Sequence, residues 1–372
     1  MRGPAGPAAV VRRAVTAVVL VAVVAGCQGA GWGYNVYGQV GDGTTTNRST
    51  PTAQPGTAWA TVDAGAFHSC GIDVQGQAWC WGQNDGYLLG DGTVTARPVP
   101  VLVQGGATDH VSIDAGLLQT CAIRSDATLW CWGWFGPGNY HREPTQIGEP
   151  GWASVWAGTY HSCGVRTDGT LWCWGENYYG QVGDGSDATW VDEPTQVSGA
   201  GWATVTGGTN HTCALRTDGT AWCWGLADDG IFDPGEFGSS STPVQVPNSW
   251  TAIESGLRYV CGLRADHTAW CWGYNGSGQL GLGFVSGIGE SVRVPTQLPG
   301  DDWRSISPGS DSTCGLRLDH TAWCWGNNNL GSLGDGTNTS TASPTPVAGG
   351  ETWREISSGW HHVVGVHRAT AG

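Results

Sequence analysis

The chain has 372 residues and carries 31 acidic residues against 16 basic ones, all of them arginine, so its formal net charge is −15 and its pI is about 4.8. This excess of negative charge repels polyanions and excludes nucleic acid as an expected partner. Helical periodicity is absent after residue 26, and the 62 glycines and 23 tryptophans favour an all-β fold with many turns.

The first 26 residues are predicted to be an export signal, because basic residues precede an apolar run at 14–25. The following Val-Ala-Gly-Cys resembles a bacterial lipobox, and the resemblance implies cleavage before Cys27 and lipidation of its sulfur. Residues 27–30 would then form a lipidated tether, so we expect an exported protein anchored in the cell envelope. The alternative is an ordinary secretory leader and a secreted protein. No second apolar run is long enough to span a bilayer.

The stretch 163–175, CGVRTDGTLWCWG, predicts a β-hairpin. Its Asp-Gly pair is a turn signal that places Gly169 in the left-handed conformation. Counting outward from this turn sets the two cysteines directly opposite each other, at about 4.5 Å between α-carbons, where a disulfide can form. The same register sets Gly164 opposite Trp172, and we expect the small residue to make room for that indole.

The same unit recurs with its two cysteines at constant spacing. The pairs are Cys70 and Cys80, Cys121 and Cys131, Cys163 and Cys173, Cys213 and Cys223, Cys261 and Cys271, and Cys314 and Cys324. The sequence therefore predicts six disulfides, each within one structural unit. Paired cysteines in this number also favour an oxidising compartment, which supports export independently of the leader.

A seventh copy of the unit is split between the two chain ends. A Gly-x-x-x-x-Cys segment begins each hairpin, and the last copy starts at Gly359 with Val364 in place of the cysteine. Its expected partner in the same register is Gly31, next to an isolated Trp32-Gly33 near the amino end. We therefore expect strands from both termini to pair and close a ring.

The segments between the hairpins repeat as well. A tryptophan six residues before each repeat glycine, replaced once by His110, begins a short alternating strand, and a proline suited to an edge position precedes it. Several short strands in each period of about 50 residues predict a β-propeller. Seven periods predict a monomeric, all-β, seven-bladed propeller over residues 31–368, with residues 369–372 as a tail.

Two repeated polar features could suggest metal sites, but each has a structural explanation. A histidine follows three residues after the repeat glycine at His68, His161, His211 and His362. Equivalent positions on different blades surround a ring, whereas zinc requires its ligands around one point. The Gly-Asp-Gly-Thr loops lack the alternating acids of calcium loops, which favours turn chemistry. We expect neither metal nor cofactor, and no motif for a catalytic residue is present.

Segments such as 207–225 and 174–185 resemble regulator-of-chromosome-condensation repeats, and the resemblance covers nearly all of residues 31–368. It implies a seven-bladed propeller closed by strands from both termini. The eukaryotic namesake exchanges nucleotide on a small nuclear GTPase and binds chromatin, but this chain differs in charge, disulfides and leader, so that activity is not expected here. Secreted bacterial relatives include an inhibitor that caps β-lactamases with one propeller face, which implies protein binding without identifying a partner.

Departures from the repeat mark the candidate binding residues. They follow the Trp-Gly strand of each copy, so we expect them to gather on one face of the ring. The candidates are Trp134, Phe135, Tyr140, Tyr178, Tyr179, Trp190, Asp228, Asp229, Phe232 and Phe237. Aromatic residues mixed with acids are typical of interface hot spots. The hypothesis is a face that docks a protein or a cell-wall glycan; a structural envelope protein, a periplasmic enzyme and indifferent loop variation are the alternatives.

Overall fold

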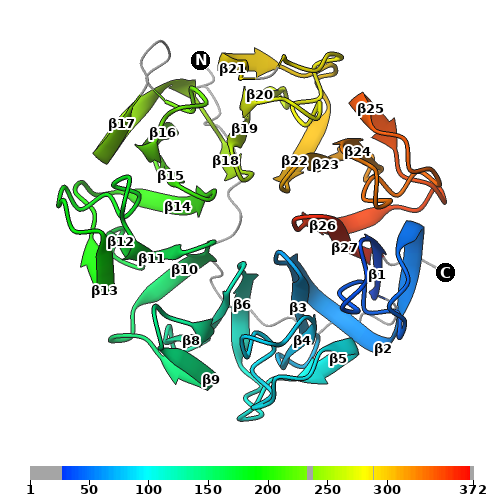
Figure 1. The fold of residues 1–372 in the computed structure, drawn as a ribbon, viewed down its shortest axis with the longest axis horizontal. Helices are drawn as coiled ribbons and strands as arrows, with labels where there is room; N and C mark the ends of the chain where they lie inside the picture. Colours follow the sequence, from blue (N-terminus) through cyan, green and yellow to red (C-terminus); the bar gives the residue numbers. More distant parts are fainter. Residues whose placement is uncertain (1–26, 233–237, 288, 369–372) are drawn as a thin grey trace, which may run out of the picture.

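A computed structural model describes residues 27–232, 238–287 and 289–368 as β-sheets arranged around a central axis (Figure 1). Five sheets have four strands each, and one has seven because the long strand β2 (Arg48–Ala64) serves two blades. The first half of β2 pairs with β1 (Gln28–Gly33), and its second half pairs with β3 (His68–Asp73). The predicted all-β, seven-bladed propeller is therefore confirmed. The predicted leader and tail, 1–26 and 369–372, lie outside the described residues.

Each blade has four antiparallel strands, which are counted here from the axis outward. The innermost strands are the second half of β2, β6 (His110–Ala115), β10 (Trp152–Ala157), β14 (Trp202–Gly207), β18 (Ala252–Ser255), β22 (Trp303–Pro308) and β26 (Trp353–Ser358). The second strands are β3, β7 (Gln119–Arg124), β11 (His161–Arg166), β15 (His211–Arg216), β19 (Tyr259–Leu263), β23 (Ser312–Arg317) and β27 (His362–His367). The third strands are β4 (Ala78–Gly82), β8 (Leu129–Trp134), β12 (Leu171–Glu176), β16 (Thr220–Leu226), β20 (Ala269–Tyr274), β24 (Ala322–Gly326) and β1. The outermost strands are β5 (Arg97–Leu102), β9 (Tyr140–Gln146), β13 (Trp190–Gln196), β17 (Ser239–Ser249), β21 (Ser291–Gln297), β25 (Thr341–Pro346) and the first half of β2.

The hairpin register is as predicted. In the blade of β10–β13, Cys163 lies opposite Cys173, and Gly169 has a φ of 78° in the turn between their strands. All six cysteine pairs form disulfides, with α-carbons 4.0 to 4.1 Å apart. Each cross-link therefore joins the second and third strands of a single blade.

The reason for the small residue after each first cysteine differs from the prediction. Gly164 does lie opposite Trp172, but a Cβ on Gly164 would approach the ring of Trp152 to 2.6 Å. Trp152 belongs to the neighbouring innermost strand and is buried, whereas Trp172 is only half-buried and donates its indole N–H to Thr170 at 2.9 Å. The small residue thus makes room for the tryptophan of the innermost strand, which hairpin spacing alone does not reveal.

The hydrophobic core lies between the blades. The disulfide of Cys163 and Cys173 packs against Trp202 and Trp224 of the next blade, and the other disulfides pack on their neighbours in the same way. Burial of indoles at the junctions, together with a disulfide at six of them, stabilises the ring, because each large apolar side chain contributes about 1.5 to 3 kcal/mol. Stability therefore resides at the junctions between blades as well as within them.

Both chain ends contribute to the closing blade, as predicted. Gly31 of β1 lies opposite Val364 of β27, and Val364 is buried where the other blades have a cysteine. In Figure 1 these strands lie side by side between β26 and β2. However, β1 begins at Gln28, so most of the predicted tether 27–30 is part of the sheet. Pairing of Gln28 with Ala58 and of Gly29 with Val366 orders these residues.

Candidate functional site

One end of the ring carries the long loops, and we call it the loop face. Neighbouring strands are antiparallel, so the first and third strands of each blade end on the same side of the ring. The segments that follow third strands are 34–47, 83–96, 135–139, 177–189, 227–238, 275–290 and 327–340. The short turns after first strands lie on this face as well. The topology therefore confirms that the sequence-predicted loops share one face.

Buried asparagines hold most of these loops in shape. Asn35 accepts the N–H of Val40 at 2.9 Å and donates its amide to the carbonyl oxygen of Thr44 at 3.1 Å. Equivalent bonds to the main-chain N–H five residues later are made by Asn84, Asn177, Asn275 and Asn328. The acid of the first Gly-Asp-Gly-Thr loop, Asp42, accepts the N–H of Thr44 at 2.9 Å. Burial acts to raise the pKa of Asp42, but hydrogen bonds from Thr44 and Arg48 lower it overall. The acids of these loops therefore stabilise turns.

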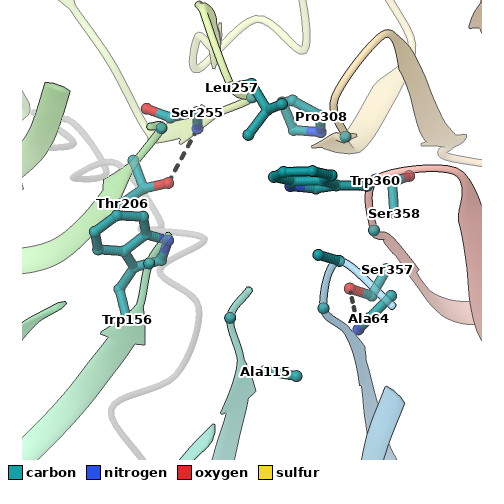
Figure 2. A pocket seen from close by; sticks show the side chains of 18 of the residues that line it. Ala64, Ala115, Trp156, Thr206, Ser255, Leu257, Pro308, Ser357, Ser358 and Trp360 are labelled. Atoms are coloured by element: carbon teal, nitrogen blue, oxygen red, sulfur yellow. Dashed lines mark hydrogen bonds between the residues drawn. The ribbon is translucent and has the colours of Figure 1, made fainter. Parts of the chain in front are cut away.

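A cavity of about 140 Å³ lies on the axis of the ring, where residues from all seven innermost strands and the turns after them meet. Figure 2 shows the indoles of Trp156 and Trp360 on opposite sides of this cavity, with Leu257 and Pro308 between them. Asp63, Asp114 and Glu254 also line it, and none of the lining residues is basic. The cavity is therefore both aromatic and acidic.

A ring of side-chain to main-chain hydrogen bonds surrounds the cavity and joins neighbouring blades. A side chain two positions before the repeat glycine accepts an N–H from the next blade. These bonds run from Ala115 to Asp63 (2.8 Å), from Ala157 to Asp114 (2.7 Å), from Ser255 to Thr206 (3.0 Å), from Ser358 to Ser307 (2.9 Å) and from Ala64 to Ser357 (3.1 Å). The pattern is interrupted where Trp156 has no acceptor and where Pro308 has no N–H. Two of the cavity carboxylates thus tie adjacent blades together.

The repeat glycines allow the blades to approach closely at the cavity. A Cβ on Gly116 would lie 2.5 Å from the carbonyl oxygen of Gly158 in the next blade, although the φ of Gly116 is unexceptional. Glycine is required here because the neighbouring main chain occupies the side-chain position. This close approach brings the turns of neighbouring blades together around the cavity.

Aromatic rings extend from the cavity across the loop face. Phe67 packs against Trp360 with ring centroids 5.4 Å apart, and it also contacts Tyr34 and Tyr37 at 6.3 and 5.9 Å. These four residues were not predicted as binding residues. For Phe67 and Trp360 a signal is present in the sequence, since the two positions after the repeat glycine vary in residue type between copies.

Several predicted candidates form further aromatic contacts on the next two blades. Trp134 contacts Trp190 at 5.4 Å and Tyr160 at 6.1 Å. Tyr140 contacts Tyr87 at 6.1 Å, and Phe135 stacks on His141. Tyr178 and Tyr179 lie on the loop that follows β12 and are exposed, Tyr178 to 68%. We call the whole set the aromatic arc: Tyr34, Tyr37, Phe67, Tyr87, Trp134, Phe135, Tyr140, Tyr160, Tyr178, Tyr179, Trp190 and Trp360.

The acidic loop after β16 differs from the prediction. Phe232 is only 4% exposed and packs in the core with Trp250 and Trp272, so it is not available to a partner. Asp229 is buried as well and pairs with Arg258, with 2.9 Å between Oδ2 and Nε. Asp228 is exposed, and Phe237 lies outside the described residues. The alternation of acids and aromatics in this loop thus reflects internal packing in part.

The histidine column joins blades. The imidazole Nε2 of His68 lies 2.8 Å from the hydroxyl of Thr120, that of His161 lies 2.8 Å from Thr212, and that of His362 lies 2.7 Å from Ser69. Burial lowers the pKa of each of these histidines, and of His211, to about 3. Within the described parts of the chain, no three His, Cys, Asp or Glu side chains gather as metal ligands would.

Cys27 lies at the end of the ring opposite the loop face. Strand β1 ends on the loop face at Gly33, and its six residues extend about 20 Å. The Cys27 carbonyl accepts the N–H of Trp59, and its sulfur is buried 3.6 Å from Nη1 of Arg354. Among the described residues, no helix has the length and hydropathy needed to cross a bilayer.

Comparisons with solved structures show the same fold at low identity. Prp20p from Saccharomyces cerevisiae, studied together with its binding to Gsp1p and histones, is 17% identical, with 94% of this chain and 93% of that chain covered and a TM-score of 0.83. Human WBSCR16 is 17% identical, with 93% and 100% covered and a TM-score of 0.82. The CRINKLY WD40 ectodomain of the Arabidopsis thaliana receptor kinase ACR4 is 18% identical, with 83% and 91% covered and a TM-score of 0.52. A comparison with curated proteins finds no similar sequence.

Two profiles of the regulator of chromosome condensation (RCC1) repeat match the sequence. One matches residues 59–86, 152–181, 202–231, 250–279 and 303–332. The other matches residues 31–72, 75–123, 168–215, 266–316 and 319–366. Because these matches span most of the chain and follow its blades, the protein belongs to the regulator of chromosome condensation (RCC1) repeat family.

Proposed function

We propose that this protein is an exported propeller that binds a partner protein on its loop face and performs no catalysis. The observation that carries the proposal is the aromatic arc, which gathers residues from four consecutive blades on one face. Such a collection of Tyr, Trp and Phe side chains is typical of the hot spots that dominate protein interfaces. Tyr37, Tyr140 and Tyr178 are exposed to solvent and are available for contact.

Charge on the loop face defines the partner further. The loops after the third strands carry several acids, among them Asp85, Asp187 and Asp228, and no arginine. The cavity at their centre is lined by further carboxylates. A partner with a basic surface is therefore favoured, and its association rate should fall as salt concentration rises.

The relatives support a protein partner over a glycan. Prp20p was described with its binding to Gsp1p and histones, and yeast RCC1 (Prp20) has been crystallised bound to Kap60. These propellers thus recognise proteins, although their identity to this chain is below 20%. For this chain we propose the same type of ligand and not the same partners.

Export and anchoring are part of the proposal. Six disulfides between strands of the same blade are consistent with an oxidising compartment. An anchor at Cys27 would attach the end of the ring that is remote from the loop face, so the aromatic arc would point away from the membrane. Mass spectrometry of the peptide containing Cys27 tests this part. An unmodified cysteine in the mature protein would remove the anchor and leave the docking face in place.

Capture from the native cell envelope tests the docking face. We expect the triple variant Tyr37→Ala, Tyr140→Ala, Tyr178→Ala to lose a saturable protein partner that the wild-type propeller retains. The matched control is Val74→Ala with Leu318→Ala, which removes two side chains of similar exposure, 47% and 46%, from the opposite face. Equal capture by all three proteins would contradict the proposal. Capture of glycan, turnover of an envelope substrate, or no saturable ligand would favour the respective alternatives.

A further inference from the structure

One junction between blades lacks a hydrogen bond that the other junctions have. At six junctions, the tryptophan that follows the second cysteine, or Gly31 in the closing blade, donates its indole N–H to a main-chain carbonyl in the loop of the preceding blade. The pairs are Trp32 with Ser332 (3.0 Å), Trp81 with Gln39 (2.8 Å), Trp132 with Leu88 (2.8 Å), Trp224 with Gln181 (2.9 Å), Trp272 with Ile231 (2.7 Å) and Trp325 with Gln279 (2.9 Å).

At four of these junctions the same carbonyl accepts a second hydrogen bond from a hydroxyl of the second strand. Ser69 donates to Gln39 at 3.0 Å, Thr120 to Leu88 at 2.9 Å, Thr212 to Gln181 at 2.7 Å and Thr313 to Gln279 at 2.7 Å. An indole and a hydroxyl thus form a socket for one carbonyl oxygen. The loop of the preceding blade normally fills that socket.

The junction between β6–β9 and β10–β13 has the donors and lacks the acceptor. Trp174 is 4% exposed, and its Nε1 has no hydrogen-bond partner. Ser162, opposite Trp174 in the sheet, accepts the N–H of Gly158 at 3.4 Å and donates to no described residue. The preceding loop is only 135–139, with Phe135 in place of the organising asparagine, so it delivers no carbonyl to this position.

A small pocket lies beside Trp174. Its volume of about 10 Å³ accommodates about one oxygen atom. Trp174 lines the pocket together with Trp134, Phe135, Tyr160 and Trp190. The last four side chains are half-buried and belong to the aromatic arc, so the pocket lies directly beneath the surface that we assign to partner binding.

We propose that this pocket is a socket for a main-chain carbonyl oxygen of the docked partner. The partner segment would complete the junction as the loops of the other blades do, and an apolar side chain beside that carbonyl would pack on Trp134 and Trp190. The buried indole N–H would then gain the acceptor that it lacks in the free protein, which favours the complex. This inference rests on the proposed function and specifies one contact within it.

The first test needs no partner. N-methylacetamide supplies a carbonyl oxygen with small apolar neighbours, and indole N–H resonances report hydrogen bonding to it. We expect the Trp174 indole signal, identified by its loss in Trp174→Phe, to shift downfield and saturate. The Trp224 indole, already bonded to Gln181, should not move. Equal behaviour of the two signals, as for a pocket filled by a tightly held water, would overturn the socket.

The second test compares Trp174→Phe with Trp224→Phe, since both substitutions keep an aromatic ring and remove one N–H. Trp174→Phe should leave Tm unchanged and weaken partner capture about tenfold. Trp224→Phe should lower Tm and leave capture by the folded protein unchanged. An equal drop in Tm for both would show that Trp174 is already bonded, and would contradict the inference. Full capture by Trp174→Phe together with loss in the tyrosine triple variant would refute the socket alone, and full capture by both would refute the docking face as well.

Discussion

Buried imidazoles at the junctions make the fold sensitive to acid. His68, His161 and His362 each bond to a hydroxyl of the next blade, and burial holds the pKa of each at about 3. His211 is equally buried, but the next blade offers Val260 and no hydroxyl, so its Nε2 has no partner. All four histidines therefore remain neutral in the folded protein at neutral pH.

Because of these histidines, the free energy of unfolding should decrease as the pH is lowered. An unfolded histidine has a pKa of about 6.5, so between that value and about 3 the unfolded state binds more protons than the folded state. The contribution of each histidine to the free energy of unfolding is then complete above pH 6.5. Below that pH it decreases by up to about 1.4 kcal/mol for each pH unit. Urea denaturation at pH 7, 6, 5 and 4 measures this slope. His68→Gln, the residue type at Gln119, should reduce the slope by one proton; an unchanged slope would contradict the assignment.

The stability of a Phe232 variant tests whether this residue belongs to the core or to the binding surface. The sequence suggested an exposed contact, but the structure places this ring in the core. Phe232→Ala should therefore lower the free energy of unfolding by about 3 to 5 kcal/mol. Tyr178→Ala should change it by less than about 0.5 kcal/mol, because Tyr178 is exposed. Thermal and chemical denaturation of the two variants decide the matter, and similar stabilities would show that Phe232 is not a core residue.

At the scale of strands, the sequence predicts what is local and repeated. The turn at Gly169 sets the register that brings Cys163 opposite Cys173, and the same count brings Val364 opposite Gly31. The spacing of the hairpin does not reveal which residue of the innermost strand packs on it, so it does not identify Trp152 as the reason for Gly164. The extension of β1 to Gln28 is not predicted either: Gly29 pairs with Val366 of the hairpin partner, and Gln28 pairs with Ala58 of β2.

The closing blade should be the first to open. Its second and third strands are joined by main-chain pairing alone, whereas every other blade has a disulfide there, worth about 2 to 3 kcal/mol for a loop of this length. Hydrogen exchange should therefore appear first at residues 31–40 and 357–368. The hairpin at 213–223 serves as a control with the same register and a disulfide. Equal protection of the two hairpins would show that the seam is not weaker.

At the scale of the whole molecule, closure of the ring assembles the candidate site. Phe67 and Trp360 touch although they are near opposite ends of the chain, and the ring alone brings them together. The sequence predicts that the variable loops share one face, but it does not show that Phe67 and Trp360 lie beside each other on that face. That continuity depends on which blades are neighbours and on the way the innermost turns surround the axial cavity.

The same geometry places the loop face and Cys27 at opposite ends of the propeller. The loop face carries the aromatic arc, the acidic loops and the cavity, whereas β1 starts at the other end beside Cys27. Under the proposed function, a partner would approach the loop face while the opposite end would face the anchoring surface. The proposed function requires that a protein partner cover the loop face.

Hydrogen exchange of the propeller with and without its captured partner tests that claim most directly. We predict added protection in the loops 34–47, 135–139 and 177–189, and none in the turns of the opposite face at 74–77 and 318–321. Protection restricted to those opposite turns would contradict the account.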